Sequence, residues 1–197
     1  EQALVRDWIT QLVVIPGLEI TTAEEAHILG LFPTLTAAVA MQEIVYEHLT
    51  PGENDEELFG LQVVASADDE VEAMCPRLLI GATDLDLDQV VADIADLGGL
   101  AIAAHVDRES YSLISQLGFV PAGLDFAALG ISRQLTLPEA RQRFPEYEEH
   151  TFLSTSDAHD LDQLGSNPTQ MMVAAPDFAE LKLALAGQDG RRVVEPV

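Results

Sequence analysis

This sequence of 197 residues has too few cysteines for a disulfide bond and lacks long apolar runs. Cys75 is the single cysteine, so no intramolecular disulfide can form, and this usage fits a reducing compartment. Apolar runs such as residues 100–104 are far too short to span a bilayer. The first residues lack the basic and apolar segments of a secretory signal. We therefore expect a cytoplasmic protein that does not interact with membranes.

Positive charge is also scarce. The chain has 9 Lys and Arg residues against 34 Asp and Glu residues, and its formal net charge is −25. A surface of this kind repels polyanions, so we expect no long nucleic acid as a partner. A small phosphorylated substrate is compatible with this charge if metal ions or a few arginines reverse the field locally.

The chain has enough apolar residues, 48% of the total, for one good core. Apolar runs with strand character alternate with amphipathic stretches, which favours an α/β fold with a mostly parallel sheet. The expected helices span residues 4–11, 34–48, 86–97, 107–116 and 176–186, and the later strands span 100–106, 126–132, 151–156 and 170–175. Residues 50–83 are acidic and rich in turn formers, and we interpret them as a solvated insertion or lid within a single domain.

Ionisable side chains occur at the edges of four apolar runs. Glu19 follows the turn Pro16–Gly17, His27 opens HILGLF, His105 ends LAIAAH, and Asp157 and His159 end FLSTSDAH. Functional residues of α/β sheets and barrels collect at strand ends, so these five groups are expected to converge. Imidazole and carboxylate together suit zinc, iron or manganese.

Each of these residues alone also suits a structural role. A single histidine at a strand end can be a hydrogen-bonded core residue, Glu19 can be a surface residue, and the pair Asp157–His159 can close a turn. Their joint appearance favours a metal site. His48, in the last turn of a helix, and His150, beside three glutamates, are not expected to join it.

Three stretches resemble the PHP (polymerase and histidinol phosphatase) family of metal-dependent phosphoesterases. They are IPGLEITTAEEAHILGLF (15–32), GGLAIAAHVDR (98–108) and LSTSDAH (153–159). RLLIGAT and FAELKLALAG also look like the branch with a PHP-associated C-terminal region. The resemblance implies a distorted (β/α)7 barrel with up to three divalent ions. By this analogy Glu19 bridges two ions, His27 and His105 bind one of them, Asp157 completes a second site and His159 binds a third.

The His-x-His motif with which family members begin is absent from these 197 residues. The chain begins where the third family strand is expected, so we predict a single PHP-like domain over residues 1–197 that lacks its N-terminal strands, an incomplete barrel. The family chemistry implies hydrolysis of a small phosphate monoester or diester by metal-activated water, with Asp157 and His159 as catalytic residues. Arg108 and Arg133 are candidate phosphate contacts, although a surface ion pair suits Arg108 equally well.

Two alternatives stay open. One is a catalytically impaired remnant that acts as a regulatory or assembly domain. The other is a metal-dependent hydrolase of a different bond. The sequence does not define the oligomeric state.

Overall fold

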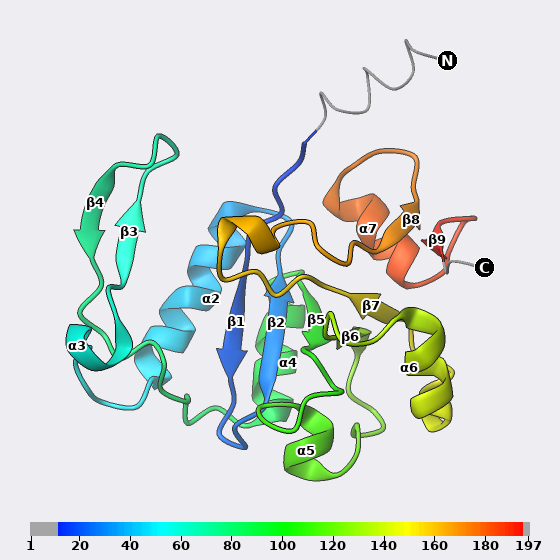
Figure 1. The fold of residues 1–197 in the computed structure, drawn as a ribbon, viewed down its shortest axis with the longest axis horizontal. Coiled ribbons are helices and arrows are strands. Elements are labelled where there is room, and N and C mark those ends of the chain that lie inside the picture. The colour runs from blue at the N-terminus through cyan, green and yellow to red at the C-terminus, as the bar shows by residue number, and fades with distance from the viewer. Residues whose placement is uncertain (1–11, 195–197) are drawn as a thin grey trace.

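A mixed five-stranded sheet forms the centre of the chain, with helices on both of its faces (Figure 1). The computed structural model describes residues 12–194, so the helix predicted at 4–11 lies outside the described residues. The elements are β1 (Gly17–Thr21), β2 (His27–Leu31), α2 (Leu35–His48), α3 (Glu56–Phe59), β3 (Val63–Ala65), β4 (Val71–Met74), α4 (Leu87–Asp96), β5 (Leu100–Ala103), α5 (Leu113–Leu117), β6 (Phe126–Ile131), α6 (Leu137–Arg143), η1 (Pro145–Tyr147), β7 (Phe152–Ser154), η2 (Leu161–Gln163), β8 (Gln170–Met172), α7 (Phe178–Leu185) and β9 (Arg192–Val194).

The strand order of the central sheet is β1-β2-β5-β6-β7. β2 is antiparallel to both of its neighbours, whereas β5, β6 and β7 are parallel. The prediction of an α/β fold is confirmed, but the described residues form an open sheet and no closed barrel. The expectation of a mostly parallel sheet is wrong for β2. Only five residues separate β1 from β2, which is too short a connection for a parallel crossover.

Each face of the sheet has its own apolar layer. Ile20, Ile28, Ala103 and Leu129 belong to the layer that includes the buried side chains of α2 and α4. The residues that alternate with them, including Leu100, Ile102 and Leu153, form a second layer with Leu185 of α7. β5 is buried along its whole length because both layers cover it.

The helices expected at 34–48, 86–97 and 176–186 form, as α2, α4 and α7. Asp86 caps α4 by accepting a hydrogen bond from the Gln89 N–H, and Leu87, Val90, Val91 and Ile94 are buried on one side of this helix. The helix expected at 107–116 is shorter: α5 begins at Leu113, and Ser112 caps it rather than Asp107.

Residues 50–83, called the arm below, contain α3 and the β3–β4 hairpin, which forms a two-stranded sheet of its own. All seven strand residues of this hairpin are exposed, and Figure 1 shows the hairpin projecting beyond α2, away from the central sheet. That the arm is an insertion or lid within one domain stays a prediction.

The C-terminal part adds α7 and a second small hairpin. The strand expected at 170–175 exists as β8, but it pairs with β9 rather than with the central sheet. Among the described residues, no helix has the length and apolar character needed to cross a membrane.

Candidate metal centre

Glu19 and His27 share one face of the β1–β2 pair. Thr21 pairs with His27 and Glu19 pairs with Leu29, so Glu19 and His27 are diagonal neighbours across the two strands. Glu19 lies in the middle of β1 rather than at its end, and His27 is the first residue of β2. Since β2 is antiparallel, its first residue lies at the edge where β1 and β5 end.

His105 reaches the same edge from the loop after β5. The backbone reverses there: His105 has a φ of 29°, and the Val106 N–H donates to the Gly130 carbonyl oxygen at 2.8 Å. A Cβ at position 130 would lie 3.1 Å from the Ala103 carbonyl oxygen, so glycine on β6 allows this close approach.

Three ligand atoms converge at this edge. Nδ1 of His27 lies 3.3 Å from Nε2 of His105. The two oxygens of the Glu19 carboxylate serve one nitrogen each: Oε2 lies 3.6 Å from His27 Nδ1, and Oε1 lies 3.6 Å from His105 Nε2. Within the described residues this trio is a set of potential metal ligands whose donor atoms all lie within 4.8 Å of one another. Ligand atoms 2.0–2.1 Å from a tetrahedral ion lie about 3.3 Å apart, so the trio fits a single divalent ion such as zinc.

Burial sets the charge state of the two imidazoles. It lowers the pKa of His27 to about 4, with a further contribution from His105. Burial is also the main cause of the lowered pKa of His105, and the positive charge of Arg108 adds to it. Both rings are therefore neutral at pH 7, as a metal ligand must be. The pKa of Glu19 is raised, first by burial and then by repulsion from Asp157.

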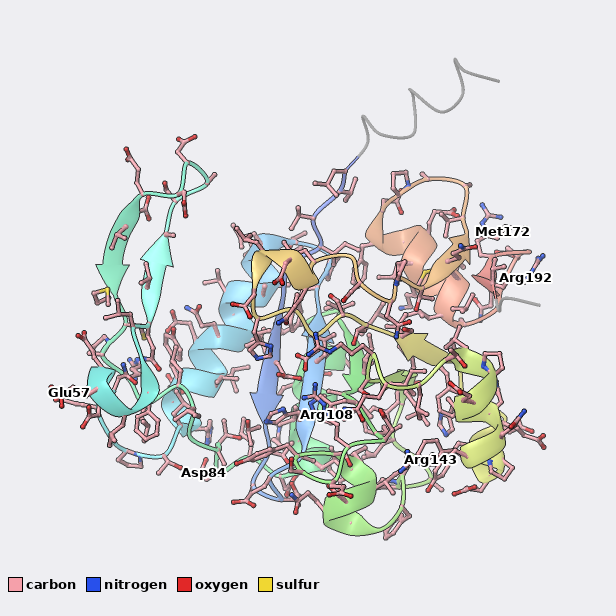
Figure 2. The ribbon with its side chains drawn as sticks, in the orientation of Figure 1. Glu57, Asp84, Arg108, Arg143, Met172 and Arg192 are labelled. Atoms are coloured by element: carbon pink, nitrogen blue, oxygen red, sulfur yellow. The ribbon has the colours of Figure 1, made fainter. Side chains whose placement is uncertain are left out.

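Asp157 and Arg108 form an ion pair beside the trio. The Asp157 side chain is 19% exposed and its backbone has a φ of 45°. Figure 2 shows Arg108 in front of the central strands. The pair is close enough to act on Glu19, because Asp157 raises the pKa of Glu19 and Arg108 lowers it.

His159 lies further out. Its Nδ1 is 3.0 Å from the Asp157 carbonyl oxygen and 3.9 Å from an Asp157 carboxylate oxygen, and 77% of its side chain is exposed. Arg133 is exposed just after β6. Within the part of the chain that the structure describes, Arg133 has no ion pair or hydrogen bond with the trio. The roles predicted for Asp157, His159, Arg108 and Arg133 stay predictions.

His48 and His150, which were not expected to join the metal site, lie outside it. His48 Nδ1 is 2.6 Å from Asp84, and Figure 2 places Asp84 near the base of the arm. His150 lines a cavity of about 620 Å³, together with Leu100, Phe126 and Thr151. These last three residues are at or just before the first residues of β5, β6 and β7, so the cavity lies at the edge opposite the trio and is not part of the candidate centre.

Sequence reasoning missed two supports of the centre. Asp107 is buried and accepts hydrogen bonds from the Ser132 N–H at 2.7 Å and from its hydroxyl at 2.6 Å, which ties the loop after β5 to the end of β6. Tyr111 contacts His27. Nothing in the sequence marks Tyr111, but the positions of Asp107 two residues after His105 and of Ser132 at a strand end could have suggested their contact.

The fold of this chain is similar to that of known proteins. No protein-family model matches the chain. The lesion-specific endonuclease EndoQ of Pyrococcus furiosus has a similar structure, with a TM-score of 0.65 and 19% identity over 90% of this chain and 40% of that one. Endonuclease Q in complex with a 27-mer duplex substrate, with an abasic lesion at the active site, has a TM-score of 0.62 and 18% identity over the same shares.

In sequence, the chain is 34% identical over 108 residues to the uncharacterized protein YqxK of Bacillus subtilis (strain 168). That match covers 51% of this chain and 27% of YqxK. The chain thus spans about 40% of the similar structures and about a quarter of this relative. The structural likeness supports the PHP-type fold that the three motifs predict, whereas the branch with a PHP-associated C-terminal region stays a prediction.

The expectation of a small substrate and no nucleic acid is wrong. Endonuclease Q, which has a similar fold, is in complex with a 27-mer duplex substrate, so the fold is compatible with a polyanionic substrate. Net charge describes the whole surface, whereas the potential at a site depends on its own cations.

Proposed function

We propose that this chain contains the metal-binding part of a metal-dependent phosphoesterase of the nuclease class, which hydrolyses a phosphodiester bond in DNA. One observation carries the proposal: three neutral or anionic ligand atoms converge within 4.8 Å at one edge of a sheet. The likeness of this sheet to endonuclease Q supports the choice of substrate class.

Glu19, His27 and His105 would hold a divalent zinc, manganese or iron ion in this centre. Three protein ligands leave a coordination position free, the arrangement of catalytic rather than structural sites. A bound ion supplies Lewis-acid activation of the phosphoryl group and lowers the pKa of a water molecule.

The neighbouring residues would bind and orient the phosphate. Arg108 is 40% exposed at the centre, so its guanidinium group can neutralise a phosphate oxygen. Asp157 pairs with Arg108 and holds it in place, and its carboxylate would serve as a ligand of a second ion. The exposed ring of His159, oriented by the Asp157 carbonyl oxygen, can deliver a proton to the departing oxygen. Arg133, at the end of β6, is a further phosphate contact.

Two measurements on the chain as given test this proposal. Elemental analysis and calorimetric titration with zinc and manganese should find at least one tightly bound ion. Incubation with duplex oligonucleotides, with and without one abasic position, should then give metal-dependent strand cleavage. Glu19→Gln should lower both metal binding and cleavage, whereas His48→Gln, which alters a histidine outside the centre, should lower neither.

Each negative result would point to a different conclusion about function. Metal binding without cleavage of DNA or of any phosphate ester would favour a catalytically impaired regulatory domain. Metal-dependent hydrolysis of other bonds, without phosphoester cleavage, would favour a hydrolase of another class. Absence of metal binding would refute the proposal altogether.

A further inference from the structure

The loop between β5 and α5, residues 104–112, contacts two residues of the candidate centre, Asp157 and His27. Arg108 of this loop pairs with Asp157, and Tyr111 contacts His27. The loop is closed on itself, because the Ser112 hydroxyl donates to the Arg108 carbonyl oxygen at 2.8 Å. The loop thus connects a residue that contacts Asp157 with a residue that contacts His27.

Tyr111 contacts His27 through both its backbone and its ring. The His27 N–H donates to the Tyr111 carbonyl oxygen at 2.9 Å. The phenol ring stacks on the imidazole, with centroids 4.8 Å apart and planes 19° apart, which lies within the range of favourable offset stacking. Stacking of this kind restricts the imidazole to one plane, so Tyr111 fixes the plane of the His27 ring. Within that plane, Nδ1 lies on the side of His105 and Glu19.

The backbone of Tyr111 is strained. Its φ is 55°, in the left-handed region that a bulky side chain rarely adopts. Burial does not explain this conformation, because 46% of Tyr111 is exposed. Strained residues persist where surrounding contacts hold them, and they gather at functional sites. The two contacts with His27 help to hold Tyr111 in this conformation.

We propose that Tyr111 is a positioning residue, which presets the His27 ring for metal coordination. The inference rests on the metal centre of the proposed function. The side chain of Tyr111 contacts His27 through its ring, so the aromatic plane and not the hydroxyl group is the active feature. Phenylalanine should therefore replace tyrosine without loss.

Cobalt(II) is the probe for the test, because its visible absorption reports the geometry of its ligands. The chain as given would be titrated with Co²⁺, and so would Tyr111→Phe, Tyr111→Leu and Tyr111→Gly. We expect Tyr111→Phe to match the wild type within about 2-fold. Tyr111→Leu and Tyr111→Gly should bind Co²⁺ about 10-fold more weakly, a typical effect of removing a contact that orients a ligand, with a changed absorption spectrum.

The glycine variant separates the ring from the strain, because glycine adopts a positive φ without steric cost. Phe119→Ala, which removes another exposed aromatic ring, is the matched control and should bind Co²⁺ as the wild type does. Circular dichroism establishes which variants are folded, and the comparison of Tyr111→Phe with Tyr111→Leu suffices if the glycine variant unfolds.

Unchanged Co²⁺ affinity and spectrum in Tyr111→Leu, with a normal wild-type response, would overturn the role of Tyr111 and leave the metal centre intact. A wild type that binds no Co²⁺, or that binds it equally well after His27→Gln, would overturn the centre itself and the proposal with it. A loss in Tyr111→Leu that Tyr111→Phe does not share would support the positioning role.

Discussion

His27 and His105 are 78 residues apart in sequence, yet Nδ1 of one lies 3.3 Å from Nε2 of the other. β2 and β5 are antiparallel neighbours, with Ile28 opposite Ala103, so the residue before Ile28 and the residues after Ala103 meet at one edge. The Ala104 N–H also donates to the His27 carbonyl oxygen at 3.1 Å. The two imidazoles are thus held together by the sheet itself.

Loss of either imidazole should therefore weaken metal binding strongly. We expect His27→Gln and His105→Gln each to lower the affinity for Zn²⁺ by at least about 10-fold, since only two protein ligands remain. Isothermal titration of the chelator-treated chain measures this. His48→Gln and His150→Gln are the controls, and affinities equal to wild type in both ligand variants would contradict the assignment.

The Arg108–Asp157 pair should contribute little to folding. Its side chains are 40% and 19% exposed, and pairs with this solvent access are worth about 0.5–1 kcal/mol. A double-mutant cycle with Arg108→Gln and Asp157→Asn, measured by urea unfolding, should give a coupling energy in this range. The same variants should lower the rate of phosphoester cleavage much more, because both groups face the candidate centre. A large coupling energy with normal cleavage would indicate a purely structural pair.

The trio was predictable from sequence because its residues stand at the edges of apolar runs, and the sheet brings such edges together. The direction of β2 could not be predicted from the sequence. A histidine that opens a strand reaches the site only if that strand is antiparallel, and periodicity does not distinguish strand directions. Glu19, in mid-strand, reaches the trio by the diagonal pairing of β1 with β2.

The barrel was not predictable in the same way. A barrel closes only if the first and last strands of its sheet pair. The alternation of strands and helices indicates the class of fold but not whether the sheet closes. Asp107 illustrates a competing local choice: it is the first residue of the helix expected at 107–116, but its carboxylate accepts two hydrogen bonds from Ser132 and does not cap a helix. Ser112 provides the cap of α5.

The Asp107–Ser132 contact should support stability. Both residues are buried, so Ser132→Ala leaves one carboxylate oxygen without its hydroxyl donor, at a cost of about 1–3 kcal/mol. Urea unfolding of the metal-free chain measures this loss. Ser110→Ala, in which a hydroxyl group is removed from an exposed residue, should cost less than about 0.5 kcal/mol. Equal effects of the two substitutions would argue against a supporting role for Ser132.

The β3–β4 hairpin should be dispensable for the fold. The Cys75 N–H donates to the Gln62 carbonyl oxygen at 2.8 Å, so an Asn-Gly turn can join these two residues in place of residues 63–74. Because all seven strand residues are exposed, the deletion should change the unfolding free energy by less than about 1 kcal/mol and leave Zn²⁺ affinity unchanged. Replacement of Ile94, which is buried in the core, by alanine is the destabilising reference. Unfolding of the deletion variant would show that the hairpin is an integral part of the fold.

The stability of the metal-free chain should fall in mild acid because of His27. Its pKa is lowered to about 4, mainly by burial, whereas a histidine in the unfolded chain titrates near 6.5. The unfolded state therefore binds more protons between about pH 6.5 and pH 4, and stability decreases as pH falls through this window. His105 acts in the same direction. The raised pKa of Glu19 acts in the opposite direction, because the folded chain binds its proton first.

Urea unfolding of the chelator-treated chain at several pH values between 7 and 4 tests the balance. The wild type should lose stability by roughly 1–3 kcal/mol through the titration of His27, and His27→Gln should lose less over the same range because glutamine takes up no proton. Parallel profiles for the wild type and His27→Gln would mean that His27 does not titrate differently in the folded and unfolded chains.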